Sequence, residues 1–117
     1  MDLADNRFPD VAYPLMIVHP RTGRPSLNLP PLWASRILEL PDEEGQSLIR
    51  ILLDHIFRPD FAYWHRYALG DLVAWDNWRF IHAGSGTPGR YVRTLWQTVI
   101  RGGPQIGRLL APEEAIA

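Results

Sequence analysis

The sequence contains no cysteine among its 117 residues. It therefore has no disulfide framework and no thiolate metal site, and we expect a cytoplasmic protein. No apolar run approaches the roughly 18 residues of a membrane-spanning helix, and the acidic segment 1–5 does not resemble a signal peptide. Lysine is absent too, and a net charge of −1 without a basic cluster predicts no nucleic-acid or membrane partner.

Short strands and one helix are predicted in the first half of the chain. Apolar patterns predict strands over Ala12–His19 and Ser26–Leu29, with a turn between them in which Gly23 can adopt a positive φ. Acidic residues after Pro41 and apolar residues at helical spacing predict an amphipathic helix over about 42–57. Its apolar stripe is Leu48, Ile51, Leu52, Ile56 and Phe57.

Three further strands are predicted in the second half, over Phe61–Ala68, Leu72–Ile81 and Tyr91–Arg101. The turn at 69–71 is short enough to join antiparallel neighbours, and the chain after residue 104 is expected to be loose.

One histidine and one arginine stand out on this pattern. His82 follows the predicted strand 72–81, and Arg93 lies on the next strand, where a period of two places it on the same face as Gln97. An imidazole near a guanidinium suits a metal bound together with a chelating carboxylate. The alternatives are a structural or solvent-facing histidine and a surface arginine, which are the more frequent cases.

Two blocks resemble the TauD/TfdA family of Fe(II)- and 2-oxoglutarate-dependent dioxygenases. The first is Gly70-Asp71-Leu72-Val73-Ala74-Trp75-Asp76-Asn77 up to His82, with Arg93 and Thr98-Val99-Ile100-Arg101-Gly102 after it. The second, His19-Pro20-Arg21-Thr22-Gly23-Arg24-Pro25-Ser26-Leu27, is similar to the family's HPxTGRxxL stretch.

The resemblance covers about residues 12–103 and implies one partial domain over residues 1–117. The implied fold is mainly β with one or two helices: the C-terminal portion of a double-stranded β-helix, the jelly roll of clavaminate synthase-like proteins. The complete enzyme would use Fe(II), 2-oxoglutarate and O₂ to hydroxylate a small organic substrate.

The resemblance also implies roles for single residues. His82 matches the distal histidine of the family's iron triad of two histidines and one carboxylate, and Arg93 matches the arginine that pairs with the distal carboxylate of 2-oxoglutarate. Gln97 falls where members that process sulfonates or carboxylates often place a second arginine, so a sulfonate substrate is disfavoured here. The family's strand that shapes the site is matched by Trp75, Asp76 and Asn77.

The chain departs from the family in its other iron ligands. No histidine is followed two residues later by a carboxylate, so the His-X-Asp or His-X-Glu motif is absent. One imidazole does not hold ferrous iron usefully, because affinity depends on several converging ligands. We therefore expect a partial or truncated dioxygenase whose isolated chain is inactive, and the sequence leaves open whether this chain is an enzyme.

The alternative is a non-catalytic vestigial or interaction domain, in which Arg93 pairs with an internal acidic residue and His82 merely packs. In either case an incomplete barrel leaves open strand edges, which predict self-association or a complementary chain. The remaining histidines are interpreted structurally: His19 in a turn, His55 at the helix surface, and His65 half-buried and hydrogen-bonded.

Overall fold

A computed structural model of the chain describes residues 9–100, 106–111 and 114. The chain divides into two compact units, one formed by Met1–Asn28 with Ile81–Ala117 and the other by Leu29–Phe80. The expectation of one domain over residues 1–117 stays a prediction.

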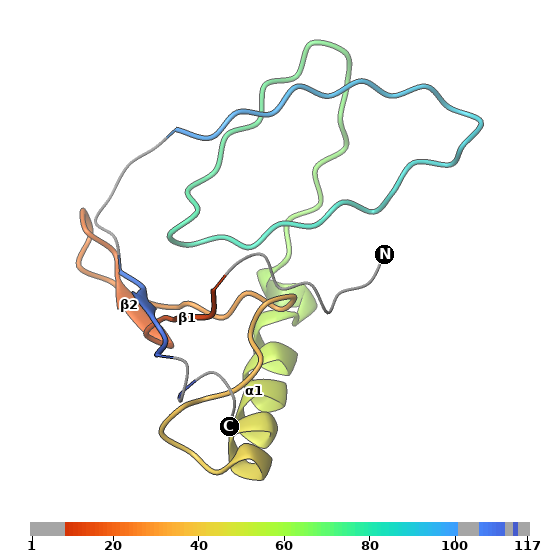
Figure 1. The fold of residues 1–117 in the computed structure, drawn as a ribbon. Coiled ribbons are helices and arrows are strands. Elements are labelled where there is room, and N and C mark those ends of the chain that lie inside the picture. The colour runs from red at the N-terminus through yellow and green to blue at the C-terminus, as the bar shows by residue number, and fades with distance from the viewer. Residues whose placement is uncertain (1–8, 101–105, 112–113, 115–117) are drawn as a thin grey trace. The chain divides into compact units, whose positions relative to one another are not determined.

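The first unit contains a β-hairpin at the place where the sequence predicts one. Strands β2 (Met16–Val18) and β3 (Pro25–Leu27) pair antiparallel, with Met16 opposite Leu27 and Val18 opposite Pro25 (Figure 1). Asn28 extends the pairing, because its backbone N–H donates to the Leu15 carbonyl at 2.8 Å. Proline is tolerated at the first residue of β3, where its missing N–H costs little.

The turn of this hairpin is built around His19. The backbone N–H of His19 donates to the Arg24 carbonyl, and its own carbonyl accepts from Gly23, both at 2.9 Å. Its imidazole Nδ1 accepts the backbone N–H groups of Arg21 and Thr22 at 3.2 and 3.1 Å. The ring is buried, and Gly23 adopts a φ of 66°, as predicted. The interpretation of His19 as a turn residue is confirmed.

A second pair of strands joins distant parts of the sequence. β1 (Val11–Ala12) pairs antiparallel with β4 (Arg108–Leu109), and Leu110 adds a hydrogen bond to the Asp10 carbonyl. The guanidinium of Arg108 donates to both carboxylate oxygens of Glu114, at 2.9 and 2.8 Å. The expectation of a loose tail is therefore wrong for residues 108–109, while residues 102–104 lie outside the described part of the chain.

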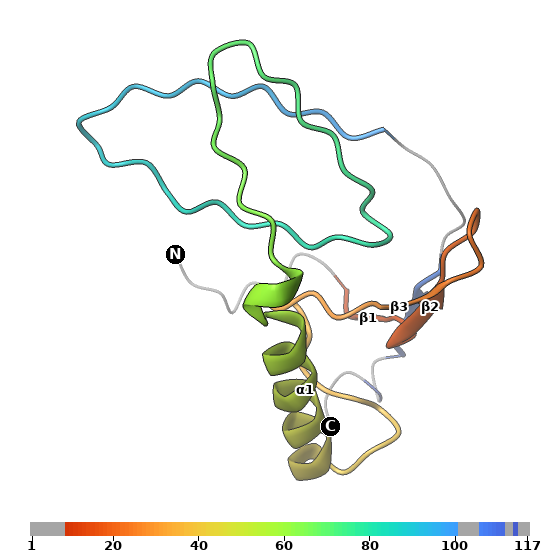
Figure 2. The same cartoon turned by 180° about the vertical axis from the view of Figure 1, so that it is seen from behind.

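The second unit contains the predicted helix, α1 (Asp42–Ile56), followed by the 3-10 turn η1 (Pro59–Phe61) (Figure 2). Acidic residues in the first turn suit the positive end of the helix dipole. The face of α1 that is least exposed to solvent differs from the predicted apolar stripe. Two residues of that stripe, Ile51 and Phe57, are more than half exposed. The helix instead turns inward Gly45, Leu48, Ile49, Leu52, Leu53 and Ile56.

Close approach explains the glycine on this face. A Cβ at Gly45 would lie 3.6 Å from Ile37, so the helix and the segment before it come into contact at this point. The side-chain amide of Gln46 donates to the Ser35 carbonyl and ties the same two segments together. The core of this unit therefore lies between α1 and the preceding segment.

The three strands predicted in the second half do not form in this structure. Between residues 62 and 100 the backbone runs as irregular or extended chain with isolated turns, and none of it belongs to a ladder (Figure 1). Phe61 closes η1, and Arg101 lies outside the described residues. The alternating pattern identified segments suited to a sheet, but a strand also needs a neighbour for its backbone groups.

The coarse fold class agrees with the sequence: short β-strands with one α-helix. A jelly-roll portion stays a prediction. Among the described residues, no helix combines the length and apolar character needed to cross a bilayer. The cytoplasmic location also stays a prediction.

Substitution of His19 tests the turn. We expect His19→Leu to raise the amide hydrogen-exchange rates of Arg21 and Thr22 by about fivefold, because each of these two backbone donors loses a hydrogen bond worth ~1 kcal/mol. His19→Asn is the matched control, since its side-chain oxygen can accept from the backbone two residues on. Equal exchange in both variants would contradict this account.

Candidate functional site

Arg93 makes a hydrogen bond to the loop that precedes it. Its Nη1 donates to the Thr87 hydroxyl at 3.2 Å, and the side chains of both residues are exposed. A guanidinium carries five N–H donors in a planar fork that matches a carboxylate. The chemistry of this side chain is therefore compatible with binding an anion.

The Trp75-Asp76-Asn77 stretch forms a turn rather than part of a strand. The indole N–H of Trp75 donates to the side-chain oxygen of Asn77, and the carboxylate of Asp76 accepts the backbone N–H of Trp78, both at 2.9 Å. The Asp76 carbonyl also accepts from Arg79 and from Phe80. This is the Asx-type local bonding that Asp and Asn favour, and it competes with strand pairing.

The other predicted site residues, His82 and Gln97, are exposed. His82, Arg93 and Gln97 belong to one unit, whereas the turn at 75–77 belongs to the other. The face shared by Arg93 and Gln97 was predicted from a strand that does not form. Their convergence on one site therefore stays a prediction.

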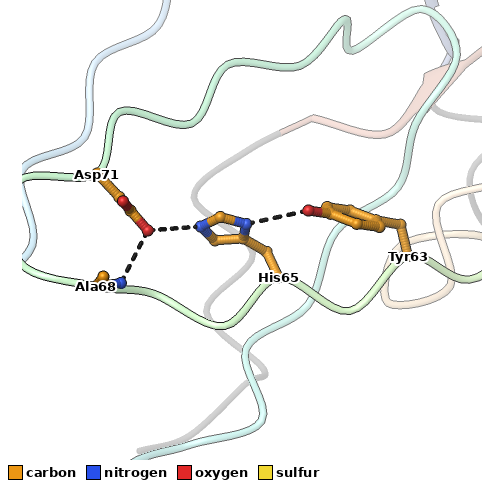
Figure 3. Close-up of polar contacts among 4 residues, drawn as sticks. All are labelled: Tyr63, His65, Ala68 and Asp71. Carbon is orange, nitrogen blue, oxygen red and sulfur yellow. Dashed lines mark hydrogen bonds and ion pairs between the residues drawn. The ribbon is translucent and has the colours of Figure 1, made fainter.

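A polar network that the sequence indicated only in part surrounds His65 (Figure 3). Its Nε2 donates to the Asp71 carboxylate at 3.1 Å, and its Nδ1 lies 3.3 Å from the Tyr63 hydroxyl. The Tyr67 ring meets the imidazole edge-on, with 4.6 Å between the ring centroids. The imidazole is 27% exposed, which confirms the interpretation as a half-buried, hydrogen-bonded histidine.

Sequence reasoning missed Asp71 as the partner of His65. The available signal was an aspartate in a Gly-Asp turn six residues after the histidine. The pKa of Asp71 lies below its ordinary value of 3.8, first because the Ala68 backbone N–H donates to the carboxylate, at 2.8 Å. Desolvation opposes this shift, and the hydrogen bond and charge of His65 add to it. The carboxylate thus holds both the turn and the imidazole.

The comparison with known protein families gives a match over residues 2–99 to the family described as "Taurine catabolism dioxygenase TauD, TfdA family". The chain belongs to this family. Its resemblance to TauD/TfdA proteins, inferred from the two sequence blocks, is thereby confirmed. No solved structure gave a significant match.

Several of the curated relatives are dioxygenases by name. The chain is 40% identical to the alpha-ketoglutarate-dependent 2,4-dichlorophenoxyacetate dioxygenase of Cupriavidus pinatubonensis, over 68% of this chain and 27% of the relative. It is 36% identical to the (S)-phenoxypropionate/alpha-ketoglutarate-dioxygenase of Sphingobium herbicidovorans, over 84% of this chain and 34% of the relative. Pentalenolactone F synthase of Streptomyces arenae is 38% identical over 61% of this chain and 24% of the relative.

The matches thus span about a quarter to a third of the length of these relatives. TauD/TfdA membership implies Fe(II) and 2-oxoglutarate, and the two groups fit this chain differently. Within the described ranges no three His, Cys, Asp or Glu side chains gather where a metal could be held. The residues described here therefore do not form an iron site by themselves, whereas the Arg93 guanidinium has the chemistry of a carboxylate partner.

Acidification tests the turn held by Asp71. Because the pKa of Asp71 is lowered, its contacts are complete above pH 3.8 and are lost as the pH falls through the lowered pKa. We expect the Ala68 amide resonance in NMR spectra to titrate with a midpoint below 3.8. Asp71→Asn should abolish this titration, and Asp60→Asn, at an exposed carboxylate paired with Arg58, should leave it unchanged. A midpoint at or above 3.8 would show that the Ala68 contact does not stabilise the carboxylate.

Proposed function

We propose that this chain forms part of an Fe(II)- and 2-oxoglutarate-dependent dioxygenase, corresponding to the C-terminal portion of its jelly roll. In this proposal His82 is one metal ligand and Arg93 binds the distal carboxylate of 2-oxoglutarate. The supporting observation is membership of the TauD/TfdA family over residues 2–99, a range that contains His82 and Arg93. In this proposal the other histidine and the carboxylate of the iron triad are supplied by a separate chain, because the His-X-Asp or His-X-Glu motif is absent from residues 1–117.

The proposed substrate is a small organic molecule. Two of the matched relatives are named for phenoxyacetate or phenoxypropionate compounds, which carry a carboxylate. Gln97, the substrate-side candidate, offers an amide, which donates and accepts hydrogen bonds but carries no charge. We therefore favour a substrate whose polar group is neutral at that point and disfavour a sulfonate. Trp75, Asp76 and Asn77 support the site in this proposal.

An anaerobic titration with Fe(II) and 2-oxoglutarate tests the function. The charge-transfer absorption of the two bound together should be absent for the isolated chain, because it lacks a three-ligand set among its described residues. It should be present when the chain is mixed with the separately produced remainder of the Cupriavidus relative, the part outside the matched 27%.

The roles are separated by two variants of the mixed sample. His82→Ala should abolish the absorption, whereas His55→Ala, at an exposed position on α1, should not change it. Absorption that survives His82→Ala would remove His82 from the metal site. If the mixture with the parent chain shows no charge-transfer absorption, the non-catalytic interaction domain is favoured instead.

We also propose that the extended segments associate with other strands, from a complementary chain or a second copy. The support is the exposure of apolar side chains on one alternating set of the segment 91–100: Val92 is 100% exposed, Trp96 95% and Ile100 93%. Side chains two or four residues apart lie on one side of an extended segment. Large apolar side chains exposed along one side of a segment favour association.

Self-association is measurable by sedimentation across protein concentrations. Trp96→Lys should raise the midpoint concentration of association by about tenfold or more, because a buried tryptophan contributes roughly 2–3 kcal/mol. Leu32→Lys is the matched control, since Leu32 is 86% exposed but precedes the helix. A monomer at all concentrations, or equal effects of the two variants, would overturn the proposal for residues 91–100.

A further inference from the structure

The loop between His82 and Arg93 contains one stiff point in an otherwise glycine-rich sequence, Ala83-Gly84-Ser85-Gly86-Thr87-Pro88-Gly89. Thr87 precedes a proline, which restricts its backbone to the extended region. It is also β-branched, which restricts its χ1 angle. The backbone N–H of Tyr91 donates to the Pro88 carbonyl at 2.9 Å and closes a turn directly after Thr87. The Thr87 hydroxyl is therefore held at a defined place relative to the chain that follows.

That hydroxyl accepts the hydrogen bond from Arg93 Nη1 at 3.2 Å. An exposed arginine samples many rotamers, and ordering it on binding costs conformational entropy. A fixed acceptor six residues earlier reduces this cost, because the guanidinium already occupies a preferred orientation. An uncharged hydroxyl also orients the group without neutralising its positive charge, as an acidic side chain at the same place would do.

We infer that Thr87 is a positioning residue for Arg93, which it orients to bind the distal carboxylate of a dicarboxylate such as 2-oxoglutarate. The inference rests on the proposed role of Arg93 and adds a role for the hydrogen bond between Arg93 and the Thr87 hydroxyl. It also explains why a Thr-Pro pair lies within a glycine-rich loop. Gly86, whose φ is 80°, lets the chain reverse direction, and Thr87 restricts the backbone at one position of the loop.

Two matched variants of the full chain separate the hydroxyl from the shape of the side chain. Thr87→Val keeps the branched shape and loses the acceptor, whereas Thr87→Ser keeps the acceptor. We expect Thr87→Val to weaken the binding of 2-oxoglutarate by about three- to tenfold, as for the loss of one hydrogen bond. The binding is measured by NMR titration of each variant mixed with the remainder of the Cupriavidus relative. Thr87→Ser should stay within about twofold of the parent chain.

A second readout needs no ligand. Rotation of the Arg93 guanidinium about its Cζ–Nη bonds, measured by nitrogen-15 NMR, should be faster in Thr87→Val than in the parent chain and Thr87→Ser. This measurement reports the hydrogen bond itself. Unchanged resonances of the β2–β3 hairpin show that the variant is folded, and a general loss of folding would shift them. Faster rotation together with unchanged affinity would show that the contact exists but does not position Arg93, and would overturn the inference.

The remaining variants distinguish failure of the inference from failure of the proposed function. Arg93→Ala should abolish binding of 2-oxoglutarate, and Arg90→Ala, at the neighbouring arginine over the Tyr91 ring, should leave it unchanged. If Arg93→Ala abolishes binding and Thr87→Val has no effect, only the inference about Thr87 is wrong. If the mixture that contains the parent chain does not bind 2-oxoglutarate, or binds it equally well after Arg93→Ala, both are overturned.

Discussion

An extended segment becomes a strand only when a neighbouring segment pairs with its backbone N–H and C=O groups. Within the described residues this condition is met for two short pairs, β2 with β3 and β1 with β4. It is not met between residues 62 and 100, where the backbone joins no ladder and Leu72, Val92 and Trp96 expose nearly their whole side chains. The unmet pairing governs the rest of the structure, because the predicted site residues lie on these segments.

The sequence predicted the elements whose cause is local. Acidic residues after Pro41 and helical spacing predicted α1 to within one residue, and Gly23 identified the turn between β2 and β3. The predicted strands beyond residue 61 failed because alternation reports which face a segment could bury and contains no information on a partner. The stripe of α1 shifted for a related reason: Gly45 approaches Ile37, and this contact decides which side turns inward.

The features of the candidate site also fall into local contacts and a non-local arrangement. The polar contacts of Trp75, Asp76, His65 and Arg93 described above join residues two to six positions apart, so each forms without a sheet. Convergence of His82, Arg93 and Gln97 on one ligand is not local and requires strands in register. Sequence reasoning therefore identified the family. The roles of these residues stay predictions, and the geometry of the site depends on chain segments that supply the missing pairing.

The contacts of His19 and His65 show which hydrogen bonds form locally, without strand pairing between residues 62 and 100. The Nδ1 of His19 accepts two backbone N–H groups, so this imidazole is an acceptor in the turn and is unsuited to hold a metal through that nitrogen. Both ring nitrogens of His65 lie against Asp71 and Tyr63. His65 would have to give up one of these contacts before it could bind iron, and His19 could not bind it through Nδ1 without losing its turn contacts. His82 is the histidine proposed here as a metal ligand, and the order of the loop up to Arg93 decides whether it can act together with Arg93.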